Sequence, residues 1–308
     1  MKALQCTELG GPEKLQVNEI DAPEAMPGHV VIDVKSGSIN FPDVLMIQGL
    51  YQFQPPLPFI PGGESAGVIS EVGEGVTKFK EGDKVFAMTG VGAFAEKILA
   101  AESNCMPIPE SMDFDSAAAL SMTYGTSLYA LKQRASLQPG ETLLVLGASG
   151  GVGLAAIELG KAMGAKVIAA ASTQDKIDMC LSHGADEGFI YPSSNFDRDQ
   201  QKELSNKIKE LTGGLGPNVI YDPVGGSYAE PCLRSIAWEG RYLVIGFAAG
   251  ADQIPKMPLN LTLLKGCQIV GVFWGAWVGQ FPDENKKNFD ELFNLHSEGK
   301  INPEVSQK

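Results

Sequence analysis

The strongest constraint on the fold is the stretch 143–156, which reads LLVLGASGGVGLAA. A short apolar run typical of a buried strand leads into a turn of small residues, and a helix-like segment follows. The dinucleotide-binding fingerprint needs small residues at three positions: for the tight turn, for backbone approach to a pyrophosphate, and for packing of helix on strand. Ala148, Gly150 and Gly153 stand at these positions, beside Gly151. The turn therefore predicts a nucleotide site; the alternative is a structural glycine turn of another α/β protein.

The segments around this turn set the fold class. From about residue 116 onward, strand-like and helix-like patterns alternate. Runs such as 143–146 and 167–171 are unbroken apolar, as expected for parallel strands covered on both faces. The preceding part instead holds short alternating segments between glycine turns, typical of a β-rich, barrel-like module. The chain is therefore predicted to be α/β, with a doubly wound parallel sheet and a β-rich domain before it.

Composition excludes several classes of partner. The chain has 24 Lys and Arg against 37 Asp and Glu, for a net charge of −13. Such an acidic chain has no electrostatic footprint for nucleic acid and is not suited to an anionic membrane surface. We also expect no signal peptide and no membrane-spanning segment. The five cysteines lie far apart without a CxxC pair, which suits a reducing cytosol, so we expect a cytoplasmic protein.

The end of the second predicted strand favours one cofactor. An NAD site normally places Asp or Glu there, about 20 residues after the glycines, to bind the ribose 2′-hydroxyl. Residues 169–173 here read AAAST, and Lys176 follows. Ser172 leaves room for a 2′-phosphate and Lys176 can neutralise it, which favours NADPH. The alternative for Lys176 is an ordinary solvated lysine of a helix.

Five segments together carry a family resemblance. They are SINFPDVLMIQGLY at 38–51, PGGESAGVISEVGEG at 61–75, the segment 80–85, the turn 148–153 and YDPVGG at 221–226. In this order they resemble the zinc-independent NADPH:quinone oxidoreductases of the medium-chain dehydrogenase/reductase superfamily. The resemblance implies a GroES-like catalytic domain over 1–118, a Rossmann NADP-binding domain over 119–272, and a return to the catalytic domain over 273–308. Family members continue beyond such an end with a helix and a strand, so the last part is expected to be truncated, the alternative being a domain that closes differently.

The same resemblance addresses metal binding. Zinc-dependent members carry a cysteine, a histidine and a later cysteine or aspartate where this chain has Asn40, Gly63 and, near the third position, Leu120. These side chains are not a zinc ligand set, and the cysteines of a structural zinc lobe are missing from 90–101. We therefore expect hydride transfer without metal to an acceptor that is already electrophilic. A quinone is the first expectation, and the α,β-unsaturated carbonyl double bond of an enone, enoyl or haloacrylate compound is the alternative.

Two residues are expected to act on the substrate. Asn40 replaces the first zinc ligand, and its amide can donate to a carbonyl oxygen of the acceptor. Tyr51 matches a family tyrosine that can stack on a ring or donate through its hydroxyl. The alternatives are a turn-forming asparagine before a helix, whose side chain caps Asp43, and an ordinary half-buried loop tyrosine.

The resemblance also assigns the cofactor contacts. Thr126, Gly246 and Phe247 match residues beside the nicotinamide, whereas Lys176 and Tyr191 match contacts to the 2′-phosphate and adenine ribose. The expected cofactor-binding residues are Thr126, Ala148, Ser149, Gly150, Gly151, Val152, Gly153, Ser172, Lys176, Tyr191, Gly246 and Phe247.

Three further features have ordinary structural interpretations. Asp222 is expected to cap the turn at Gly225 and Gly226 rather than to catalyse, and Glu64 to be a buried carboxylate. The resemblance implies that the segment from Gln268 to Trp274 is an edge strand that pairs with its mate in a homodimer. The functional alternative of another class is a nucleotide-binding structural protein, as in crystallins recruited from this family.

Overall fold

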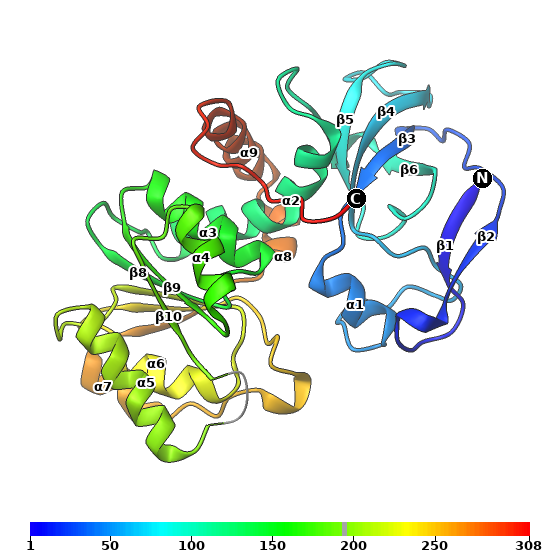
Figure 1. Ribbon diagram of the computed structural model, residues 1–308. Coiled ribbons are helices and arrows are strands. Elements are labelled where there is room, and N and C mark those ends of the chain that lie inside the picture. Colours follow the sequence, from blue (N-terminus) through cyan, green and yellow to red (C-terminus); the bar gives the residue numbers. More distant parts are fainter. Residues whose placement is uncertain (193–195) are drawn as a thin grey trace. The chain divides into compact units, whose positions relative to one another are not determined.

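The computed structural model describes residues 1–192 and 196–308 (Figure 1). The chain divides into two compact units: Met1–Met122 with Pro303–Lys308, and Thr123–Asn302. The predicted ranges differ from this division chiefly in 273–302, which belongs to the second unit rather than the first. The reason is local packing, because Trp274 is buried against Phe289 and lies next to Gly125, all within the second unit.

The first unit is β-rich. Its main sheet is antiparallel, in the order β6-β3-β4-β5-β7, and a separate ribbon pairs β1 with β2. The core alternates along the strands, with Val30, Ile32 and Ile69 facing inward. The elements are β1 (Lys2–Cys6), β2 (Leu15–Glu19), β3 (His29–Gly37), α1 (Phe41–Ile47), β4 (Glu64–Val72), β5 (Lys84–Met88), β6 (Lys97–Ala101) and β7 (Cys105–Pro107).

The second unit is built on a parallel sheet of six strands, in the order β10-β9-β8-β11-β12-β13. The chain builds one half outward from β8 through β9 to β10, then returns to the other side of β8 and builds β11 to β13. This is the doubly wound order, and such sheets bind ligands at the carboxyl ends of the strands where the direction reverses, here β8 and β11. The strands are β8 (Thr142–Leu146), β9 (Lys166–Ala171), β10 (Glu187–Ile190), β11 (Val219–Asp222), β12 (Arg241–Val244) and β13 (Gln268–Gly271).

The helices of this unit follow from the same alternation. α2 (Phe114–Leu128) crosses the division between the units and continues as a π-helix, Tyr129–Arg134. The remaining helices are α3 (Gly151–Ala162), α4 (Gln174–Ser182), α5 (Arg198–Leu211), α6 (Ala229–Ser235), α7 (Asn260–Lys265), α8 (Trp274–Gln280) and α9 (Pro282–Ser297). In the described part of the chain, none of the helices is long and apolar enough to cross a membrane.

The central strands are covered on both faces, as the unbroken apolar runs predict. In β8 the residues from Leu143 to Leu146 are buried, and in β9 those from Val167 to Ala171. Each buried leucine or valine contributes about 1.5–3 kcal/mol of transfer free energy. The β-rich unit and the doubly wound unit confirm the predicted fold class.

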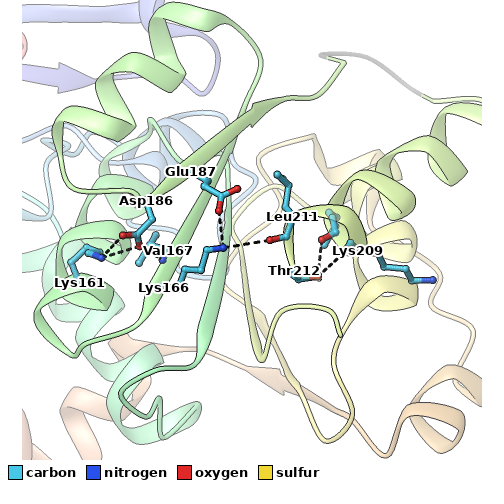
Figure 2. Close-up of polar contacts among 9 residues, drawn as sticks. Lys161, Lys166, Val167, Asp186, Glu187, Lys209, Leu211 and Thr212 are labelled. Carbon is cyan, nitrogen blue, oxygen red and sulfur yellow. Dashed lines mark hydrogen bonds and ion pairs between the residues drawn. The ribbon is translucent and has the colours of Figure 1, made fainter. Parts of the chain in front are cut away.

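The amino ends of β9 and β10 carry ion pairs (Figure 2). Lys161 binds Asp186 at 2.6 Å, and Lys166 binds Glu187 at 2.7 Å. Burial alone would raise the pKa of Asp186, but the bonds from Lys161 and from the backbone of Val167 hold it below its usual value. These pairs lie at the strand ends opposite to those where doubly wound sheets bind ligands, so their role is structural.

The predicted strand from Gln268 to Trp274 is shorter in the structure. β13 ends at Gly271, and Trp274 starts α8 instead. The indole N–H of Trp274 donates to Asn285 of α9 at 3.3 Å, which fixes this side chain inside the unit. The edge position itself is confirmed, since β13 is the last strand of the sheet.

Candidate active site

The glycine-rich turn connects β8 to α3 at the carboxyl end of the sheet. Gly147 has φ = +55°, a left-handed conformation that favours glycine. Gly150 is the N-cap of α3 and supplies no side-chain hydrogen bond to the helix. The first backbone N–H groups of α3 therefore receive no side-chain cap and can donate to another partner, such as a phosphate.

Gly153 shows why the turn needs its third small residue. A Cβ at this position would lie 2.6 Å from the carbonyl oxygens of both Gly147 and Ala148. Any side chain would push the helix away from the strand end. Ala148 is fully buried, whereas Ser149, Gly150 and Gly151 are more exposed, so the accessible part of the turn is the part the fingerprint assigns to the pyrophosphate. The residues present therefore fit a dinucleotide.

The predicted ribose site lies at the end of β9. Ser172 follows the strand directly, and Lys176 lies in the first turn of α4. The Lys176 ammonium donates to the Ser172 hydroxyl at 3.1 Å, and Thr173 caps the helix by accepting from the Lys176 amide. The structure thus brings together the two side chains predicted for the 2′-phosphate, with Lys176 exposed.

Tyr191 contacts the turn in a way that the sequence did not indicate. Its side chain is buried, and its hydroxyl oxygen accepts from the backbone amide of Gly147 at 3.1 Å. The ring packs against Tyr228, with 4.5 Å between centroids. Burial raises the pKa of the Tyr191 hydroxyl, so it stays neutral. Tyr191 therefore supports the first residue of the turn, whatever contact it also makes with a ribose.

Thr126 lies half-buried on α2, next to a residue that touches the turn. The hydroxyl of Ser127 donates to the Val152 carbonyl at 3.1 Å and is 2.8 Å from the Tyr221 hydroxyl. Gly125 lies against Trp274, since a Cβ there would come within 2.5 Å of the indole ring. These contacts fix the α2 segment that carries Thr126 relative to α3 and β11.

Asp222 ends β11, beside the reversal point of the sheet. It is buried, and its Oδ1 accepts from the amides of Val224 and Gly225, each at 2.8 Å. The hydroxyl of Tyr242 donates to Oδ2. Burial raises the pKa of Asp222, although these three donors oppose the rise. The expected turn-capping role is confirmed.

The Asp222 turn also positions Gly246 and Phe247. The amide of Ile245 donates to the Asp222 carbonyl at 2.9 Å, just before these two residues. The Phe247 ring lies against Gly225, where a Cβ would come within 3.0 Å of it. The predicted nicotinamide residues 246 and 247 thus follow β12 at the same carboxyl edge as Asp222 and the turn.

Asn40 in the first unit has both its backbone and its side chain bound. Its amide N–H donates to Oδ2 of Asp43 at 2.8 Å, in a capping box at the start of α1. Its side-chain nitrogen donates to Oε1 of Glu64 at 2.5 Å. The capping alternative is confirmed by this capping box, and the side-chain nitrogen makes a separate contact that the sequence did not predict.

Tyr51 follows α1 and lies half-buried against an apolar cluster that includes Met46, Ile47 and Phe59. Burial, and then the nearby carboxyl of Asp43, raise the pKa of its hydroxyl. The hydroxyl therefore remains protonated and able to donate.

The residues at the three zinc positions also belong to the first unit. The Asn40 side chain binds the Glu64 carboxyl, and Gly63 directly precedes Glu64 in the chain. Leu120 is fully buried in α2. Across residues 1–192 and 196–308, no three His, Cys, Asp or Glu side chains are grouped so that they could hold a metal ion. Metal independence stays a prediction that rests on residue type.

Family models of known proteins match a segment of each of the two units. A family model described as "Alcohol dehydrogenase GroES-like domain" matches residues 26–110, and one described as "Zinc-binding dehydrogenase" matches 151–293. A quinone oxidoreductase-like protein 2 homolog of Nematostella vectensis is 38% identical over 97% of this chain and 80% of its own length. A quinone oxidoreductase of Pseudomonas aeruginosa is 34% identical over 100% of this chain and 91% of its own.

The chain belongs to the quinone oxidoreductase family of the medium-chain dehydrogenase/reductase superfamily. Among solved structures, Escherichia coli quinone oxidoreductase complexed with NADPH is similar with a TM-score of 0.88 at 30% identity, over 99% of this chain and 91% of that one. This family member is therefore an oxidoreductase of a family that binds NAD(P), and the resemblance stated from its motifs is confirmed.

The Asp222 network predicts a pH-dependent effect of Tyr242→Phe. The fold raises the pKa of Asp222, so this group favours folding while it is protonated and costs stability as pH rises from the ordinary aspartate range through the raised value. The Tyr242 hydroxyl favours the ionised form. Its loss should lower the free energy of unfolding by about 1–3 kcal/mol above the raised pKa of Asp222 and by less below it, as measured by urea denaturation over a series of pH values.

Tyr228→Phe is the matched control. It removes a buried hydroxyl that donates to the neutral carbonyl of Pro192 at 2.6 Å, so its cost should not change with pH. Equal destabilisation by Tyr242→Phe at every pH would contradict the inference that the Tyr242 hydroxyl favours the ionised form of Asp222.

Proposed function

We propose that this oxidoreductase transfers a hydride from NADPH to a quinone without a metal ion. The observation that carries the cofactor choice is the Lys176–Ser172 pair at the end of β9, where an NAD site would have an acid. The names of the relatives support a quinone as acceptor. The replacement of the zinc ligands by Asn40, Gly63 and Leu120 supports a reaction without metal.

Each group of residues has a task in this proposal. The uncapped amides at the start of α3, from Gly151 to Gly153, bind the pyrophosphate, and Lys176 with Ser172 binds the 2′-phosphate. Thr126, Gly246 and Phe247 hold the nicotinamide, which supplies the hydride when the cofactor is bound. Asn40 donates to the acceptor oxygen that gains negative charge, and Tyr51 holds the acceptor ring. A quinone is already electrophilic, so a hydrogen-bond donor can replace a Lewis acid.

This arrangement explains how an acidic chain can bind a polyanion. The net charge is −13, so the chain as a whole repels NADPH. The local donors are the backbone amides at the N-terminus of α3 and the exposed ammonium of Lys176. They contact the phosphates directly, at distances shorter than those at which salt screens charges.

The buried cysteines bear on the compartment. Cys6, Cys105, Cys180, Cys232 and Cys267 are all free and buried. Free thiols suit a reducing environment, and we extend the proposal to a cytoplasmic location.

Lys176→Ala tests the cofactor assignment. The loss of a charged hydrogen bond to the 2′-phosphate should raise the KM for NADPH about tenfold to a hundredfold and leave the KM for NADH unchanged. Lys202→Ala, at an exposed lysine of α5, is the control and should change neither value. If Lys176→Ala leaves the KM for NADPH unchanged, Lys176 is an ordinary surface lysine.

A panel of acceptors tests the reaction. With NADPH consumption as the readout, the purified protein should reduce simple quinones faster than enones or enoyl thioesters, and a chelator should leave the rate unchanged. A faster rate with the activated alkenes would favour the double-bond reductase. No turnover with any acceptor, despite NADPH binding, would favour a nucleotide-binding structural protein.

We also propose a homodimer that forms through β13. This strand is the last of its sheet, Ile269 is partly exposed at 36%, and Phe273 beyond it is exposed at 59%. An edge strand beside exposed apolar side chains suits pairing with the same strand of a second copy.

Ile269→Lys tests this interface, because a charge on the edge strand opposes strand pairing. The variant should elute as a monomer by size exclusion with light scattering, whereas the native protein elutes as a dimer. Val17→Lys, on the exposed face of β2, should leave the dimer intact. A native monomer, or a dimer that survives Ile269→Lys, would contradict the proposed interface.

A further inference from the structure

Glu64 is a buried carboxyl group surrounded by donors. Its side chain is 1% exposed at the start of β4. Oε2 accepts from the hydroxyl of Ser121 and from the amide of Met122 at 2.7 Å, and Oε1 accepts from Ser38 and Asn40. A buried carboxyl is costly, so four donors on one such group indicate that its place is closely determined.

The contact with Asn40 decides which way its amide faces. Since Oε1 of Glu64 accepts the bond at 2.5 Å, the nitrogen of the Asn40 amide is turned toward it and the oxygen away. The Ser38 hydroxyl is 3.2 Å from the same nitrogen and also donates to Oε1, so both acceptors lie on one side of that nitrogen. The two N–H bonds of a primary amide diverge widely. One therefore faces the Glu64–Ser38 pair, and the other points elsewhere.

A second carboxyl, Asp43, holds the backbone of Asn40 independently. It accepts from the Asn40 amide N–H at 2.8 Å and from the amides of Gly62 and Gly63, the two residues that precede Glu64. Removal of the Glu64 contact therefore frees the side-chain amide while the backbone of residue 40 stays held.

We propose that Glu64 is a positioning residue for the substrate-binding amide. Oε1 of Glu64 accepts one N–H of the Asn40 side chain and so fixes the orientation of that amide. The second N–H is then a fixed donor for the oxygen of the substrate. The inference rests on the proposed function of Asn40. It assigns to Glu64 no contact with the acceptor and no proton transfer.

A double-mutant cycle tests this role. Glu64→Gln keeps the shape, but an amide accepts at one end only and presents its own N–H₂ at the other, so it cannot serve both Met122 and Asn40. Glu64→Gln should lower kcat/KM for a simple quinone about tenfold or more in the native background. In an Asn40→Ala background it should have almost no further effect, because the group it positions is gone.

Asp222→Asn is the matched control. It disturbs another buried carboxyl, which holds the turn after β11 and no part of residue 40. Its effect on kcat/KM should therefore persist in the Asn40→Ala background. The dissociation constant for NADPH and the melting temperature are measured for every variant, and Glu64→Ala is the second variant if Glu64→Gln does not fold.

The outcomes separate the two proposals. If the native protein reduces no quinone, the proposed function fails. If it reduces quinones and the effects of Glu64→Gln and Asn40→Ala multiply independently, Glu64 has only a structural role and this inference is wrong. If Glu64→Gln lowers quinone reduction in the native background but has no further effect in the Asn40→Ala background, the positioning role of Glu64 is supported.

Discussion

The close approach of α3 to the end of β8 is the contact on which the candidate cofactor site depends. Only a hydrogen at Gly153 lets the helix lie against the carbonyls of Gly147 and Ala148. That approach aims the uncapped amides of α3 at the carboxyl end of the sheet, where the strand order reverses between β8 and β11. The Tyr191 hydroxyl then holds the Gly147 amide from the other side of the turn. A phosphate site thus results from backbone packing in a chain whose net charge opposes it.

Two buried carboxyl groups have comparable roles in the two units. Asp222 fixes the turn after β11 through the amides of Val224 and Gly225, and Glu64 accepts from Asn40, Ser121 and their neighbours. Burial raises the pKa of both groups, and hydroxyl and amide donors oppose the rise. Each carboxyl lies next to residues with a predicted role in the reaction. The pattern indicates that the fold uses buried acids to set the direction of other groups.

Much of the second unit could be predicted from local patterns. Unbroken apolar runs and a glycine turn before a helix are short-range signals, and they gave β8, β9 and α3 with their order. The absence of an acid after β9 was also a local signal. The end of β13 and the assignment of 273–302 to the second unit could not be predicted from local patterns. Trp274 packs on Phe289 and donates to Asn285, and these contacts form only in the folded chain.

The sequence by itself determined the family, the fold class and the types of residue at the candidate site, because motifs and apolar periodicity are properties of neighbours along the chain. Tertiary structure decided how those residues are held. Glu64 is 24 residues from Asn40 and 57 from Ser121, and Tyr191 is 44 from Gly147. No local pattern encodes such pairs, since a hydrogen bond between distant residues depends on strands and helices that bring them within about 3 Å.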